Sequence, residues 1–245
     1  MQIVDLIISL LALSIPPLIL LLPFFLAWWR GAKNLQRTHR KYERALKLVF
    51  LRLFGFNLEY SIKNPLEAVF EGKNQLAVSG KTFLFDRRFY GYYFARLFGG
   101  VNDGILVELV TQESPGCSLI IVPKRRRKLL EKILTLSEGL EVVRIADLDK
   151  DYLILTDNIL AVQKLINSFI IYELANLKRF LAYLIIDYFA PQMEVYFEIN
   201  DRNYSELIPR LLTLVKHIME NALKITPRKS KLETIRMLRK SLKLR

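Results

Sequence analysis

The sequence contains very few of the residues on which most catalytic and metal sites depend. Its 245 residues include one cysteine, Cys117, and two histidines, His39 and His217. A lone cysteine excludes a disulfide within the chain and a cysteine-based metal site, and it is typical of a reducing compartment. Two histidines leave almost no material for a His-based triad or a catalytic zinc site. No GxxxxGK[ST] or GxGxxG motif is present. We therefore expect no catalytic residues, no metal and no cofactor.

Charge is also absent from one long run, residues 6–29, which has 24 residues without Asp, Glu, Lys or Arg. A helix of that length measures about 36 Å, whereas the hydrocarbon core of a bilayer is about 30 Å thick. The sequence thus predicts a transmembrane anchor over residues 1–29, with Trp28 and Trp29 as interfacial anchors. A cleaved signal peptide would need a basic start and a small-residue cleavage site, which are missing. A buried helix of a soluble protein is rarely so long.

Three prolines interrupt this run, at positions 16, 17 and 23. Each removes a backbone donor and leaves a carbonyl that needs another partner inside a membrane. We expect a kinked span that packs against a membrane-protein partner or a second copy of the chain.

The orientation follows from the basic residues beside the run. Eight lysines and arginines lie in residues 30–52, and none precedes the run. The positive-inside rule predicts a single-pass cell-membrane protein with its N-terminus outside and residues 30–245 in the cytoplasm. The next apolar stretch, residues 168–190, contains Glu173, Lys178, Arg179 and Asp187, which argue against a second span.

The formal net charge of +13 is concentrated in three segments. Residues 30–52 carry a net +7, residues 224–245 carry +8, and residues 124–128 are five consecutive basic residues, so the remainder is acidic. On a helical projection, Leu35, Tyr42, Leu46 and Phe50 share one face and the basic residues occupy the other, although Leu48 and Leu51 break the pattern. The apolar stripe could pack on the domain or on a partner helix.

We predict that the basic side chains of these segments contact anionic lipid headgroups. Phosphate and an acidic protein surface remain open, as do a solvated connecting helix, a solvated helix start and a disordered tail. The predicted contact residues are Arg30, Lys33, Arg37, Arg40, Lys41, Arg44, Lys124, Arg125, Arg126, Arg127, Lys128, Arg236, Arg239, Lys240 and Lys243.

The remaining chain predicts four parts: an anchor (1–29), an amphipathic juxtamembrane helix (30–54), a cytoplasmic α+β domain (55–223) and a basic tail (224–245). Short apolar runs separated by Gly, Pro and Asn predict strands at 58–62, 66–71, 75–79, 81–86, 104–111, 118–122, 140–145 and 152–155, and later at 181–188 and 193–199. Thr156 or Asp157 is expected to cap a helix that runs through Leu165, and further helices are expected over 167–180 and from Asn203 or Ser205. This order favours an antiparallel sheet with C-terminal helices. The composition, rich in Ile, Leu, Lys and Arg, leans toward a thermophile.

Residues 149–158 followed by 161–165 read DKDYLILTDN and AVQKL. This block resembles a pattern in uncharacterised prokaryotic membrane-anchored proteins, where an acidic residue, a short apolar strand and a turn of the form Thr/Gly-Asp-Asn/Asp precede a helix. The resemblance implies a tethered α+β module and carries no active site.

These features predict a non-enzymatic interaction or accessory subunit of a membrane protein assembly, whose partners are anionic lipid and a membrane protein. The alternative is a tethered docking protein for RNA, the ribosome or DNA, because basic segments also bind phosphate. The aromatic and arginine-rich residues 83–96 fit base stacking or a packed core. A carboxylate or tyrosine enzyme is a third possibility.

Overall fold

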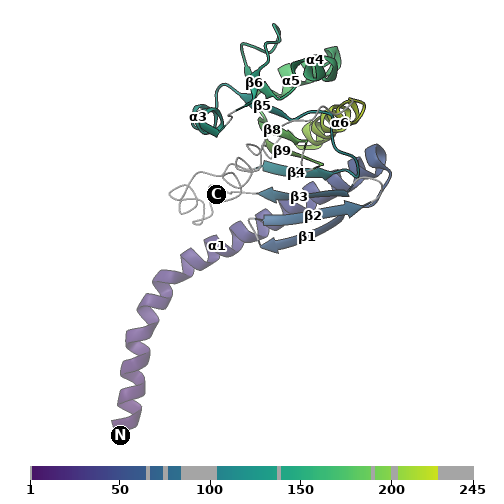
Figure 1. Ribbon diagram of the computed structural model, residues 1–245. Helices are drawn as coiled ribbons and strands as arrows, with labels where there is room; N and C mark the ends of the chain where they lie inside the picture. The colour runs from purple at the N-terminus through teal and green to yellow at the C-terminus, as the bar shows by residue number, and fades with distance from the viewer. Residues whose placement is uncertain are drawn as a thin grey trace.

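The computed structural model describes residues 2–64, 67–73, 77–83, 104–136, 139–188, 191–199 and 204–225. The protein has an α+β fold in which a nine-stranded antiparallel sheet is accompanied, in these residues, by five helices (Figure 1). The strands are β1 (Glu59–Asn64), β2 (Glu67–Lys73), β3 (Ala77–Phe83), β4 (Gly104–Val110), β5 (Leu119–Pro123), β6 (Glu141–Val142), β7 (Tyr152–Thr156), β8 (Leu181–Asp187) and β9 (Gln192–Glu198). The helices are α1 (Gln2–Phe54), α3 (Arg127–Leu136), α4 (Ile159–Leu165), α5 (Ser168–Leu177) and α6 (Tyr204–Leu223).

The strand order of the sheet is β1-β2-β3-β4-β9-β8-β5-β7-β6. The first four strands follow one another along the chain, as short connections favour. The late strands β8 and β9 then enter the middle of the sheet, where β9 pairs with β4 from Gly104↔Glu198 to Val110↔Gln192. The antiparallel sheet and the strands predicted at 181–188 and 193–199 are confirmed, but the sequence did not predict that these two strands lie in the middle of the sheet.

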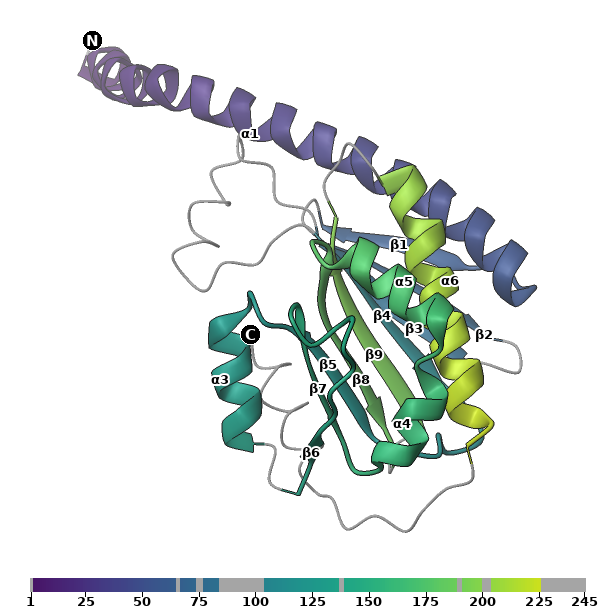
Figure 2. The same cartoon turned by 90° about the horizontal axis from the view of Figure 1, so that it is seen from above.

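Two layers of helix cover the sheet unequally. Helices α1, α4, α5 and α6 pack on one face, over alternate strand residues such as Phe70, Val107 and Val195 (Figure 2). Helix α3 lies on the other face, over Ile120, Leu155 and Ile185. Because side chains of a strand alternate between faces, neighbouring residues such as Ile120 and Ile121 belong to different cores.

Helix α1 is one uninterrupted helix of 53 residues, and it passes through the expected boundary at residues 29 and 30 without a break. Its second half confirms the predicted amphipathic pattern, because Leu35, Tyr42, Leu46 and Phe50 are buried while the basic residues are exposed. The apolar stripe packs on the domain itself. Residues 30–54 thus form a core element of the α+β domain.

Polar contacts fix α1 against the sheet and against α6. The Nδ1 atom of His39 lies 3.1 Å from the Tyr60 hydroxyl and 3.2 Å from the Thr82 hydroxyl, and these two hydroxyls are 2.7 Å apart. At the end of α1, the Lys216 ammonium of α6 donates to the Leu53 carbonyl over 2.6 Å. That contact satisfies one of the carbonyls that a helix end leaves without an intrahelical partner.

Three local expectations were wrong. Gly80 does not separate two strands but lies inside β3. A glycine is needed there because the Phe70 ring and the Leu106 carbonyl occupy the space that a side chain would fill. Helix α4 is capped by Asn158, whose side chain accepts from the Ala161 amide. The strand expected over 140–145 is reduced to the two residues of β6.

The side chains of α1 are described for Leu26 and from Trp29 onward. Neither this part of α1 nor any other described helix is long and apolar enough to cross a membrane. The predicted anchor lies for the most part outside those residues, as does the predicted tail beyond residue 225.

Candidate functional site

The exposed face of α1 carries the densest group of predicted contact residues that the structure describes. Arg30, Lys33, Arg37, Arg40, Lys41, Arg44 and Lys47 are all exposed, and Arg52 extends the row toward the end of the helix. Glu43 is the only acidic residue between positions 30 and 52, and its carboxylate pairs with Lys47 at 2.7 Å. We call residues 30–52 on this face the basic strip.

Exposed apolar side chains lie at both ends of the basic strip. At its start the Trp29 ring is exposed, and the Lys33 ammonium lies 5.0 Å from the ring centre in a cation–π contact. Near its end Leu48 and Leu51 are 51% and 53% exposed. These two leucines broke the amphipathic pattern in the sequence, and the structure places them among the basic residues.

The run at residues 124–128 lies, as predicted, at a junction between a strand and a helix, since β5 ends at Pro123 and α3 begins at Arg127. Its first three side chains serve the fold. Lys124 donates to the Asp149 carbonyl, and the Arg125 guanidinium donates to the carbonyls of Lys178, Arg179 and Leu181 over 2.8–3.2 Å. Arg126 forms an ion pair with Glu198, and burial, followed by the neighbouring charge of Arg125, lowers its pKa.

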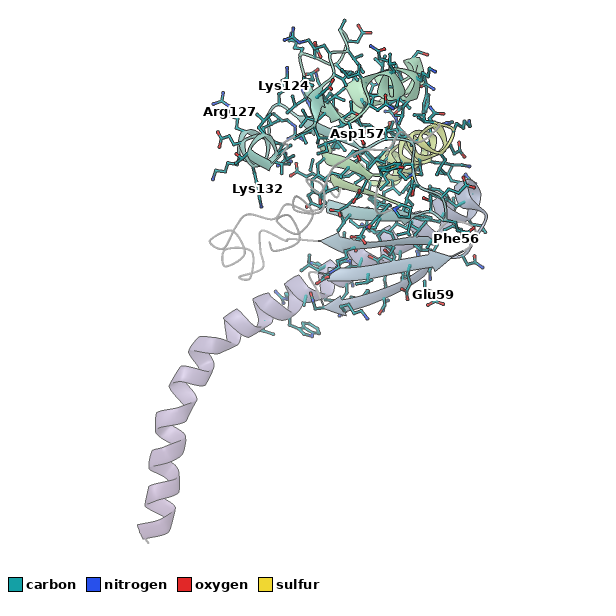
Figure 3. The ribbon with its side chains drawn as sticks, viewed as in Figure 1. Phe56, Glu59, Lys124, Arg127, Lys132 and Asp157 are labelled. Atoms are coloured by element: carbon teal, nitrogen blue, oxygen red, sulfur yellow. The ribbon has the colours of Figure 1, made fainter. Side chains whose placement is uncertain are left out.

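The last two residues of the run, Arg127 and Lys128, are exposed on the first turn of α3. Figure 3 shows Arg127 pointing away from the sheet. Sequence reasoning treated the five charges alike, because nothing in a run of basic residues tells which of them will meet a carbonyl. Contact of these residues with lipid stays a prediction, carried best by Arg127 and Lys128.

The residues that bear reactive side chains have structural surroundings. His39 is fully buried in the contact between α1 and the sheet. Burial raises the pKa of the Cys117 thiol to about 12, with a smaller effect from the Asp157 carboxylate. Among the described residues, no group of three or more His, Cys, Asp or Glu side chains is arranged to hold a metal ion.

Sequence reasoning did not find the polar group on the sheet face that carries α3. The Tyr183 hydroxyl donates to the buried Glu194 carboxylate over 2.7 Å. Burial, and then the Glu194 charge, raise the pKa of Tyr183. Glu108 lies directly opposite Glu194 in the register of β4 and β9. Alternation along each strand could have shown that Tyr183 and Glu194 each lie on a particular face. Nothing in the sequence indicated that β4 pairs with β9, which brings Glu108 opposite Glu194.

The Thr-Asp-Asn turn at residues 156–158 also has a structural role. The Thr156 hydroxyl donates to the Ser118 carbonyl over 2.7 Å, and the Asp157 carboxylate, labelled in Figure 3, accepts from the Ser118 amide over 2.8 Å. Together with the Asn158 cap, these bonds join the end of β7 to the start of β5 and begin α4.

Some predicted residues lie outside the described part of the chain. They are the side chain of Trp28, all of residues 84–96 within the aromatic stretch, and the tail residues Arg236, Arg239, Lys240 and Lys243.

No family model matches this chain, and no curated protein matches it, which agrees with a resemblance that pointed to no named family. Among solved structures, the fold is similar to that in the crystal structure of the mycobacterial trehalose monomycolate transport factor A, TtfA. The two chains are 10% identical with a TM-score of 0.45, over 80% of this chain and 98% of that one. At this distance the likeness says nothing about function.

Proposed function

We propose that this protein is a membrane-anchored, non-enzymatic accessory subunit of a membrane protein assembly, with its α+β domain in the cytoplasm at the lipid surface. One observation carries the proposal: the uncharged run and a core element of the domain belong to the same helix, α1. A membrane anchor joined through a loop would leave its domain free to turn. A continuous helix fixes the angle between the domain and its anchor.

The distance between anchor and domain is short. Ala32 is 9% exposed and Leu35 is 5% exposed, and both belong to the main core. Leu35 follows Trp29 by six residues, which is about 9 Å along a helix. A domain that begins this close to the end of the uncharged run is held beside the headgroups.

The charge distribution supports the orientation. The basic strip follows the uncharged run directly, and Lys and Arg in such a position favour the cytoplasmic side. The prolines of the run favour a membrane partner, because their freed carbonyls need neighbours in lipid. An accessory role fits a chain in which His39 and Cys117 are buried in the core.

The test is extraction and purification of the intact, affinity-tagged chain. Membranes washed with alkaline carbonate should retain it, and a variant lacking residues 2–29 should be released. In mild detergent it should purify with a stoichiometric membrane protein. Release of the intact chain by carbonate would contradict the anchor. Recovery of RNA with a steep dependence on salt, in place of a protein, would favour the nucleic-acid alternative.

A further inference from the structure

The exposed leucines of the basic strip are unlike the other features of α1. Counting 100° per residue, Leu48 coincides with Arg30, and Leu51 coincides with Lys33. Both lie in the middle of the basic arc, on the side of α1 opposite Leu46 and Phe50. Neither side chain contributes to the core, so the fold does not explain them.

The composition of this end of the strip points to a particular surface. Lys41, Arg44, Lys47 and Arg52 surround the two leucines, and the nearby carboxylate of Glu43 is paired with Lys47. Basic side chains with long apolar stems around exposed leucines are the pattern of a helix that lies in the interface of an anionic bilayer. The phosphates of a nucleic acid would pair with the basic side chains, but they would make no favourable contact with the exposed leucines.

The course of α1 turns this face in the required direction. Figure 1 shows that α1 curves and that its first half runs away from the sheet and from α6. The described domain packs on the α6 side of α1, through contacts such as Tyr42 with Tyr204 and Lys216 with Leu53. The basic strip therefore faces the side of the domain toward which the uncharged run extends. Prolines in that run are an ordinary cause of such a bend.

We propose that the end of the basic strip docks on the anionic leaflet from which α1 emerges, with Leu48 and Leu51 entering the boundary between headgroups and acyl chains. The inference rests on the proposed anchor. Docking gives the domain a second point of attachment, about 30 Å along the helix from Trp29. Two points prevent rotation about the anchor and fix which edge of the sheet faces the bilayer.

The experiment uses the full chain reconstituted into phosphatidylcholine vesicles with and without phosphatidylglycerol. An environment-sensitive fluorophore is attached to L48C or L51C, and to L160C as a matched control, because Leu160 is 67% exposed on α4. The native Cys117 is buried and should not be labelled. Fluorophores at positions 48 and 51 should shift to the blue and be quenched by spin-labelled lipid in anionic vesicles, and high salt should reverse both effects. The fluorophore at 160 should show neither.

A charge variant separates docking from simple proximity. In the labelled L48C chain, K41Q with R44Q should lower the docking equilibrium by roughly thirtyfold, since each basic residue near an anionic leaflet contributes roughly a fivefold factor. The control K164Q removes an exposed lysine of α4 and should leave the quenching unchanged.

The outcomes distinguish this inference from the anchor. An anchored chain whose fluorophores at 48 and 51 behave like that at 160 overturns the docking alone. Fluorophores shielded from both spin-labelled lipid and aqueous iodide would mean that a protein or a second copy covers the strip, and this also overturns it. A chain that carbonate removes, yet whose fluorophore at 48 is quenched in anionic vesicles, overturns the anchor and keeps the docking.

Discussion

At the scale of single residues, close approach of backbones explains why Gly80 has no side chain. In β3 it lies between β2 and β4, and a Cβ atom there would meet the Phe70 ring and the Leu106 carbonyl. The ring could rotate, but the carbonyl belongs to the adjacent strand. In the sequence, Gly80 looks like a turn residue between two strands. In the structure it lies within one strand, where close packing requires a glycine.

The substitution Gly80→Ala should therefore destabilise the protein by about 1–3 kcal/mol, as overpacking in a core does. Urea unfolding of the full chain in detergent, followed by fluorescence, measures the loss. The control Ser61→Ala changes an exposed residue of β1 and should stay within about 0.5 kcal/mol of the parent. Equal stability of G80A and S61A would contradict the packing.

The single cysteine predicts a pH dependence. Burial raises the pKa of Cys117 from 9.0 to about 12 in the folded state. Since the folded pKa is the higher one, the thiol contributes its stability fully below pH 9 and loses it progressively as the pH rises toward 12. We expect the native chain to resist a thiol reagent at neutral and mildly alkaline pH, and to react fully in guanidinium.

The variant Cys117→Ala should show a smaller loss of stability between these two pH values than the parent. Denaturant unfolding at a series of alkaline pH values provides the comparison. Rapid modification of the native thiol at neutral pH would show that Cys117 is accessible.

At the scale of elements, the basic residues of the β5–α3 junction have different roles, some in the fold and some on the surface. Arg125 closes the turn between α5 and β8 by donating to three carbonyls, and Arg127, two residues later, is exposed. A guanidinium suits this role, because it presents several donors in a fixed plane. Lysine at position 125 would not reproduce it.

Arg125→Ala should cost about 1.5–3 kcal/mol, the range for hydrogen bonds to a charged group, whereas Arg127→Ala should change the stability by less than about 0.5 kcal/mol. Denaturant unfolding distinguishes them. The pair thus separates a side chain on which the fold depends from one that is only exposed. Loss of stability in R127A equal to that in R125A would be against this division.

At the scale of the whole molecule, α1 belongs both to the uncharged run and to the core. Its second half supplies the fully buried Tyr42, Leu46 and Phe50, which pack against α6 and the first strands. The β1–β4 half of the sheet has no other described helix of comparable length over it besides α6. Folding of the domain and placement of the anchor are therefore coupled.

Truncations test this coupling. A chain of residues 30–245 should unfold cooperatively, because it keeps every described core residue. A chain of residues 55–245 should not fold, because removing several large buried side chains at about 2–5 kcal/mol each exceeds a typical total stability of about 5–15 kcal/mol. Circular dichroism during thermal unfolding provides the measurement. A cooperative transition in the shorter chain would support the domain boundary expected at residue 55.

The sequence alone predicted the features that depend on local periodicity. The buried faces of α1 and α6, including Leu46 and Leu211, follow from a repeat of about 3.6 residues, and most strands follow from alternation and turn residues. The uncharged run and its basic flank are likewise visible in the chain itself. These properties concern residues that are close together in sequence.

Tertiary structure decided everything that depends on distant segments meeting. Insertion of β9 beside β4 placed Glu194 opposite Glu108, and the turn after α5 brought three carbonyls to Arg125. The apolar stripe of α1 had two possible partners until the domain was seen to cover it, which left Leu48 and Leu51 exposed in the basic strip. A periodic pattern fixes which side of a helix is apolar, but only packing decides what lies against it.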